Sequence, residues 1–383
     1  MNDKLFEALD ALEKTKGISK EAILEALEKA LEKSYEKNFK DNNNVQVQVN
    51  KTSGEIHVYS IRKVVDEVQD PYTELCLEEA KKIKKSAAVG DDIKVEVKPK
   101  NFGRVAAQTA RNIIVQNLQQ AERKQVYEDY SDKLYEIITG TVQRINRNNI
   151  YISLGKTEGV ITPKEQIPGE RLKAGDRVKL YVANVEDPDK VKSKNSQILL
   201  SRAHPNLVVR LFEQEVPEIA DGLVEINSIA REAGSRSKIS VYSTDPNIDP
   251  IGACVGYKGS RVNYIVDELH GEKIDIALFD ENPKTFISNA LSPARINHVI
   301  SNVKEKSAVV IVADDQLSLA IGKEGQNVRL AAKLTGWKID IKGESQYMEN
   351  PSEFDALEFT EEDLIKDKNE IKEEDEDMEG GIQ

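Results

Sequence analysis

The sequence predicts a multidomain protein of the α+β class that ends in an acidic, disordered tail. Three features indicate this: helical and strand-like patterns mix in the first third, short alternating segments fill the middle, and an internal repeat follows. A length of 383 residues leaves room for two to four domains of about 100–200 residues each. Because 32% of the residues are charged and only 5% are aromatic, several small cores are favoured over one large core.

The first 128 residues are expected to form one domain of mixed helices and strands. Apolar residues recur every three to four positions in its predicted helices and alternate in its predicted strands. In chain order the elements are helices over 1–15 and 19–38, a hairpin over 45–61, a strand over 93–97 and a helix over 103–128. The inward face of the last helix is expected at Val105, Thr109, Ile113, Ile114, Asn117 and Leu118.

Residues 133–201 are expected to form a small β-barrel. Short apolar segments alternate there with turns rich in Gly, Asn and Asp, a pattern typical of such barrels. The segments are 138–142, 150–154, 160–161, 178–182 and 198–200. With 12 basic and 8 acidic residues, 133–200 is the only clearly basic part of the chain.

The barrel contains one candidate surface for nucleic acid. Tyr151 lies on a predicted strand, and aromatic rings surrounded by cations can stack nucleobases and hold phosphates. The surrounding cations are Arg144, Arg147, Lys156, Lys179 and Lys192. A structural tyrosine among solvated lysines is an equally good interpretation.

An internal repeat is the most informative feature of the sequence. Gly256-Tyr257-Lys258-Gly259 recurs 66 residues later as Gly322-Lys323-Glu324-Gly325. Each copy reads as an apolar segment, a G-x-x-G turn, a helix of about ten residues and a strand. Two copies indicate tandem small domains, over 202–281 and 282–347, because a solenoid needs at least three units.

The G-x-x-G turns are candidate clamps for a polyanionic backbone. Paired glycines let the main chain approach a ligand closely, and the helix that follows presents free N–H groups and its positive dipole end. A single such turn is usually a plain joint between helices, but two copies in the same apolar frame favour a nucleic-acid clamp. In the second copy, Glu324 is expected to point away from phosphates.

The candidate RNA-binding residues lie in and around these turns. They are Gly256, Tyr257, Lys258, Gly259, Ser260 and Arg261 in the first copy, Gly322, Lys323, Glu324, Gly325, Gln326 and Asn327 in the second, together with Arg236, Arg329 and Tyr151. Because residues 201–347 carry a net charge of −3, any basic surface there must be local. Arg231, Lys238 and Lys333 are its further candidate members.

Catalysis is not indicated, and no cofactor or metal is expected. A nucleotide-binding P-loop starting at Gly252 would need Gly at 257 and a hydroxyl residue at 259, where the chain has Tyr257 and Gly259. The four histidines lie in no metal-ligand spacing, and the two cysteines are far apart. An enzyme with RNA-binding appendages would need its catalytic residues in 1–128, and no such set is evident there.

Charge and hydropathy set the expected surroundings of the protein. Residues 348–383 hold 15 acidic residues against 3 lysines, so the net charge of −13 belongs almost entirely to the tail and does not exclude a nucleic-acid partner for the body. Phe354, Leu357, Phe359 and Leu364 form a candidate contact segment within this tail. Since no stretch approaches the ~20 apolar residues of a membrane span, we expect a soluble, intracellular protein without a membrane partner.

The order of these parts resembles the NusA family of bacterial transcription elongation factors. The barrel resembles an OB-type RNA-binding domain of the kind named after ribosomal protein S-one, and the repeats resemble KH domains of the prokaryotic topology. The stretch FGRVAAQTARNIIVQNLQQAER (102–123) and the opening residues are similar to the family's N-terminal, polymerase-binding domain. The second repeat, LSLAIGKEGQNVRLAAKLTGWKIDI, is the most specific match.

The resemblance implies a function, partners and a location. It implies a non-enzymatic, cytoplasmic, monomeric factor that binds core RNA polymerase through residues 1–128 and single-stranded nascent RNA through 133–345, where each clamp takes about four nucleotides. Such a factor modulates pausing, termination and antitermination, and other termination or antitermination factors are further expected partners. The alternative is a single-stranded RNA-binding protein that acts independently of polymerase.

Overall fold

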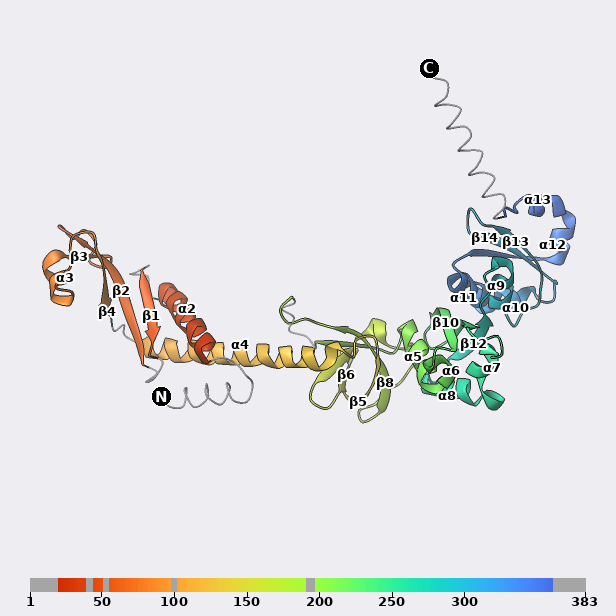
Figure 1. The fold of residues 1–383 in the computed structure, drawn as a ribbon, viewed down its shortest axis with the longest axis horizontal. Helices are drawn as coiled ribbons and strands as arrows, with labels where there is room; N and C mark the ends of the chain where they lie inside the picture. The colour runs from red at the N-terminus through yellow and green to blue at the C-terminus, as the bar shows by residue number, and fades with distance from the viewer. Residues whose placement is uncertain (1–19, 39–43, 51–54, 98–101, 191–196, 361–383) are drawn as a thin grey trace, which may run out of the picture. The chain divides into compact units, whose positions relative to one another are not determined.

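The computed structural model describes residues 20–38, 44–50, 55–97, 102–190 and 197–360 (Figure 1). The helix expected over 1–15 and the tail residue Leu364 lie outside these ranges. The chain divides into two compact units, residues 1–129 with 187–192 and residues 130–186 with 193–383. Each unit is described separately.

The first unit is a mixed α+β domain, as the sequence predicted. Its elements are α2 (Lys20–Asn38), β1 (Val45–Val49), β2 (Ile56–Val65), β3 (Glu74–Cys76), α3 (Leu77–Ile83), β4 (Asp92–Glu96) and α4 (Phe102–Ser131). β1 and β2 form the expected antiparallel hairpin, with Val47 opposite Val58, while β3 and β4 also pair with β2. Figure 1 shows α2 beside β1, where Leu27 and Leu31 pack against Val47 and Val58.

The buried face of α4 differs from the prediction by one residue. Ala106 and Ala110 are buried against α2 and the sheet, whereas Val105 and Thr109 are only half-buried. Ile113 and Ile114 of the predicted face do pack against this core, so the prediction differs only in the first turns of the helix. Alanines contribute little to an apolar pattern dominated by larger side chains, so periodicity did not single out Ala106 and Ala110.

The second unit begins with the predicted five-stranded barrel. Its elements are β5 (Ile137–Asn146), β6 (Asn149–Ser153), β7 (Glu158–Ile161), the 3₁₀ turn η1 (Pro163–Glu165), β8 (Arg177–Val185) and β9 (Ile198–Ser201). The strands close in the order β5-β6-β7-β9-β8. Gly159 has to be glycine, because a Cβ there would lie 2.4 Å from a methyl carbon of Leu200 inside the barrel.

Two small domains follow the barrel, with the same element order from their first strand onward. The first has α5 (Pro205–Glu215), α6 (Pro217–Ala220), β10 (Val224–Glu232), β11 (Arg236–Ser243), α7 (Pro250–Val255), the 3₁₀ turn η2 (Tyr257–Gly259), α8 (Ser260–Glu268) and β12 (Lys273–Leu278). The second has α9 (Pro283–Ala290), β13 (Ile296–Asn302), β14 (Ser307–Val312), α10 (Leu317–Ile321), the 3₁₀ turn η3 (Lys323–Gly325), α11 (Gln326–Thr335) and β15 (Lys338–Gly343). The predicted pattern of apolar segment, G-x-x-G turn, helix and strand is therefore present twice.

The two domains also share one sheet topology. In each, an antiparallel hairpin is extended by a parallel strand, in the orders β10-β11-β12 and β13-β14-β15. In the first domain, α7 starts at a capping residue: Asp249 accepts a hydrogen bond from the backbone N–H of Ile251, and Pro250 opens the helix without needing a donor. The fold class predicted from the sequence is confirmed.

The apolar cores hold the second unit together. Ile167 and Tyr181 of the barrel region belong to the same buried cluster as Leu207 and Phe212 of α5. In the same way, Ala230 of β10 packs into the core of the second small domain. The barrel and the two repeated domains therefore share buried surface between neighbours.

The start of the tail is ordered, in contrast to the disorder expected over 348–383. Helices α12 (Glu344–Glu349) and α13 (Pro351–Asp355) follow β15, and the rings of Tyr347 and Phe354 lie 5.9 Å apart. The backbone of Phe359 then pairs with the edge of β13 at Asn302. The aromatic residues proposed as a contact segment anchor this stretch, whereas 361–383 lies outside the described residues.

Candidate nucleic-acid interface

The first G-x-x-G loop joins α7 to α8 through a series of left-handed residues. Gly256 ends α7 with a φ of +71°, Lys258 follows with +52° and Gly259 with +77°. A Cβ on Gly256 would lie 2.7 Å from Cγ of Arg261. Both the backbone angle and this close approach require glycine at that position.

The second loop has the same backbone although its residues differ. Gly322, Glu324 and Gly325 have φ values of +76°, +53° and +74°, each within a few degrees of its counterpart. A Cβ on Gly322 would lie 2.8 Å from the backbone nitrogen of Asn327. The two loops are thus copies of one structure, not merely of one sequence pattern.

Arg261 and Asn327, each five residues after the first glycine of its loop, hydrogen-bond to the main chain beneath that loop. Arg261 donates a hydrogen bond to the carbonyl of Ala253 at 2.6 Å and pairs with Glu218 at 2.9 Å. Asn327 is buried and donates to the carbonyls of Ala320 and Leu291, both at 3.0 Å. Both candidates therefore hold the preceding helix in place and do not extend outward from the loop.

The exposed side chains of the loops are those between the glycines. Tyr257 is 80% exposed, and the ammonium of Lys258 lies 5.3 Å from the centre of its ring. Lys323 and Glu324 are exposed at the matching positions of the second loop, and Ser260 is exposed at the start of α8. Each loop therefore exposes one lysine and leads directly into the N-terminal end of a helix, a combination that suits a phosphate-bearing ligand.

The first turn of α11 binds the neighbouring domain. Nε of Arg329 lies 2.6 Å from Oε1 of Glu232, and Gln326 donates to Oε2 of the same carboxylate at 2.8 Å. The hydrogen bond from Arg329 is the main reason why the pKa of Glu232 lies below its usual range. These two candidates tie the second clamp to the end of β10 in the first domain.

Other candidate cations are neutralised by carboxylates. Arg236 pairs with Asp275 at 2.7 Å. Arg231 and Lys238, expected at a local basic surface, are buried in ion pairs with Glu272 and Asp275, so that expectation was wrong for both. A basic residue and the acid that neutralises it lie about 40 positions apart here, which local sequence does not reveal.

The barrel candidate Tyr151 has a cation above its ring. The guanidinium carbon of Arg144 lies 4.0 Å from the centre of the ring, and Arg144 also forms a two-pronged ion pair with Glu158. The aromatic-cation pair therefore exists, but its charge is balanced. Tyr151 and the clamps come from different domains of the second unit.

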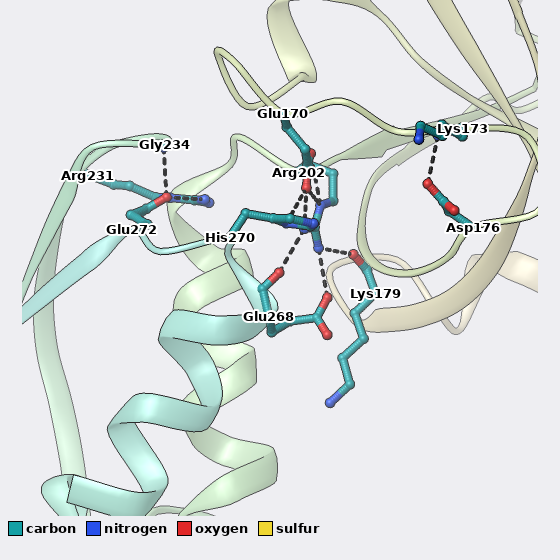
Figure 2. A network of polar contacts seen from close by, with 10 residues as sticks. All are labelled: Glu170, Lys173, Asp176, Lys179, Arg202, Arg231, Gly234, Glu268, His270 and Glu272. Carbon is teal, nitrogen blue, oxygen red and sulfur yellow. Dashed lines mark hydrogen bonds and ion pairs between the residues drawn. The ribbon is translucent and has the colours of Figure 1, made fainter.

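A buried arginine joins the barrel to the first repeated domain, and the candidates did not include it. Arg202 is fully buried and contacts Glu170 at 2.6 Å and Glu268 at 2.9 Å, as Figure 2 shows. It also donates to the main-chain carbonyls of Lys179 and Glu268, both at 2.9 Å. In the sequence, only its position between the last barrel strand and Pro205 indicated that Arg202 lies at a domain junction.

The expected metal-ligating and nucleophilic groups can be examined in the part of the chain that the structure describes. Among the described residues, no group of three or more His, Cys, Asp and Glu side chains is arranged to hold a metal ion. Burial raises the pKa of the Cys254 thiol to about 12, so this cysteine stays protonated at neutral pH. In the same part of the chain, no helix combines the length and apolar character needed to cross a bilayer.

Four protein-family models match consecutive parts of the chain. They describe the NusA N-terminal domain over residues 4–124, the S1 RNA binding domain over 132–192, the NusA-like first KH domain over 202–279 and the NusA-like second KH domain over 283–349. The two clamps lie in the two KH matches.

Characterised relatives match nearly the whole chain. The transcription termination/antitermination protein NusA of Bacillus subtilis is 51% identical over 349 residues, which cover 91% of this chain and 93% of that protein. NusA of Thermus thermophilus is 43% identical over 353 residues, covering 89% and 90%. The solution structure of the N-terminal domain of B. subtilis NusA is 48% identical and covers 32% of this chain and 99% of that chain, with a TM-score of 0.29.

Proposed function

Because the chain belongs to the NusA family of transcription termination/antitermination proteins, we propose that it acts in the cytoplasm as a non-enzymatic factor that holds nascent RNA beside RNA polymerase. Its S1 and KH domains would bind the RNA, and residues 1–128 would bind core polymerase. Longer pausing and altered termination would follow.

The observation that carries this proposal is the pair of matching clamps. Each has the same left-handed backbone, held by a first glycine that packs closely on the following helix, and each exposes one lysine, Lys258 or Lys323. KH loops of this kind clamp about four nucleotides of single-stranded RNA. Two clamps in one unit therefore suit one unpaired strand.

Tethering explains how modest RNA affinity would suffice. A clamp held beside the emerging transcript meets RNA at a high effective concentration, of the order of millimolar for short connections. The net charge of about zero outside the tail fits this arrangement, because a strongly basic body would bind nucleic acid anywhere.

The clamp assignment is tested by replacing Tyr257-Lys258 and Lys323-Glu324 with Asp-Asp in the full chain. Asp tolerates the left-handed angle at Lys258 and Glu324, so the fold should survive. We expect at least a tenfold loss of affinity for a single-stranded RNA in a fluorescence anisotropy titration, since two lysines become acids. The matched control is Lys81-Lys82 to Asp-Asp on α3, two exposed lysines of the N-terminal domain. Unchanged affinity in a folded clamp variant would refute the assignment.

The polymerase-independent RNA-binding protein is the alternative function. The RNA-binding domains are common to both functions, so the N-terminal domain distinguishes them. Capture of core polymerase by residues 1–128 supports the proposal, whereas RNA binding without any polymerase capture supports the alternative.

A further inference from the structure

Tyr264 lies exposed on the helix that starts at the first clamp. It follows Ser260, the first residue of α8, by four positions, so the two lie on one face of the helix about one turn of 5.4 Å apart. The next residue, Ile265, fills the domain core, while Tyr264 is 46% exposed. The domain core therefore does not account for this ring.

A lysine from the barrel lies over the same ring. Nζ of Lys179, on β8, is 5.3 Å from the ring centre of Tyr264. The same ammonium donates a hydrogen bond to the neutral Oε1 of Gln214 at 3.1 Å. Among the ion pairs of the described residues none includes Lys179, in contrast to Arg144, Arg236 and Arg329.

The buried arginine at the junction contacts both elements that carry this pair. Arg202 donates to the carbonyl of Lys179 and binds the carboxylate and carbonyl of Glu268, at the end of α8, as Figure 2 shows. The strand that carries Lys179 and the helix that carries Tyr264 are thus held by one guanidinium. A ligand would meet a preformed site, which lowers the entropic cost of binding.

We propose that Tyr264 and Lys179 form a stacking site for one unpaired nucleobase of the RNA held by the first clamp. This inference rests on the proposed function and adds a further contact to it. Base stacking on an aromatic ring tolerates any base, and the lysine adds an attraction for the adjoining phosphate. Glu268 pairs with Arg202, which it shares with Glu170, while the exposed Asp267 lies three residues further along α8, beyond Tyr264 as seen from the clamp. With acidic side chains beyond the ring, the RNA would reach Tyr264 from the clamp side.

The test measures binding of the full chain to a 12-nucleotide single-stranded RNA and to the same RNA with 2-aminopurine at successive positions. Tyr264→Ala should weaken binding five- to tenfold and abolish the quenching of 2-aminopurine at one position. Tyr264→Phe should stay within twofold of the unmodified protein, because it keeps the ring. Lys179→Gln should weaken binding two- to threefold and make it less dependent on salt. Tyr72→Ala, at a tyrosine of the N-terminal domain with similar exposure (52%), is the control and should change nothing.

The outcomes separate this inference from the clamp assignment. If Tyr264→Ala binds RNA like the unmodified protein while the Asp-Asp clamp variant does not, the stacking site is refuted and the clamps stand. If neither variant loses affinity, both are refuted. If Tyr264→Ala alters only polymerase binding, the ring belongs to a protein interface and the inference is equally overturned.

Discussion

Arg261 and Asn327 take the same structural place with different chemistry. Each reaches back beneath its loop to a main-chain carbonyl of the preceding helix or its neighbours, by a guanidinium in one domain and by an amide in the other. Both residues were predicted to bind RNA because they lie close to the glycines in the sequence. The orientation of these two side chains could not be predicted. A side chain in the first turn of a helix can face outward or inward, and the distant residues that pack around it decide which.

His204 gives a prediction about pH. Its ring accepts the hydrogen bond that caps α5 from Asn206 and stacks on Tyr181 at 4.5 Å between ring centres. Burial, as the largest cause, lowers the pKa of His204 below its ordinary value. The unfolded chain therefore takes up a proton at a higher pH than the folded one, so this contribution to stability is complete above about pH 6.5 and is lost as the pH falls below it.

His204→Asn keeps a side-chain cap without a group that titrates in this range. Lowering the pH from 7.5 to 5.5 should reduce the Tm of the unmodified protein by roughly 1–2 °C more than that of the variant in a thermal melt. Because both proteins contain the other three histidines, the contribution of these to the change in Tm cancels in the comparison. An equal reduction in the two proteins would show that His204 does not contribute.

Between elements, the contact of α11 with β10 links the two KH domains. Glu232 receives both Arg329 and Gln326, and Ser228 donates to the carbonyl of Leu334 at 2.9 Å. Arg329 and Glu232 lie 97 positions apart in the sequence. The sequence predicted each domain from local repeats, but it could not predict this pairing, since nothing local distinguishes a cation bound to a distant acid from one that is available to RNA.

Glu232→Gln and Arg329→Gln test which role Arg329 has. If the pair positions the two clamps, both variants should weaken binding about threefold for an RNA long enough to span them. Neither should affect a four-nucleotide RNA, which fills one clamp. The double variant should be no weaker than either single one, because the two residues act as a unit.

The opposite pattern would assign Arg329 to the RNA. In that case Arg329→Gln weakens binding of the short RNA as well, and Glu232→Gln strengthens it by releasing the guanidinium. Anisotropy titrations with the two RNA lengths distinguish the patterns.

Over the whole molecule, the order and class of the domains were predictable and the junctions were not. Alternation and turn residues predicted the barrel, and two copies of one motif predicted the repeated domains, because these signals are local. Arg202, with partners 32 and 66 positions away, and the pairing of Phe359 with β13 depend on contacts between domains. The candidate site shows the same division: the glycines and exposed lysines were recognisable, whereas Tyr264 was not.

The lifetime of a hairpin-dependent pause is the measurement that tests the proposed function most directly. It compares purified polymerase alone, with the unmodified protein, and with the Asp-Asp variant of both clamps. We predict a longer pause with the unmodified protein and a smaller effect with the clamp variant, because the variant should still bind polymerase but hold RNA poorly. No lengthening by the folded, unmodified protein, with a polymerase that responds to a control pausing factor, would contradict the proposed function.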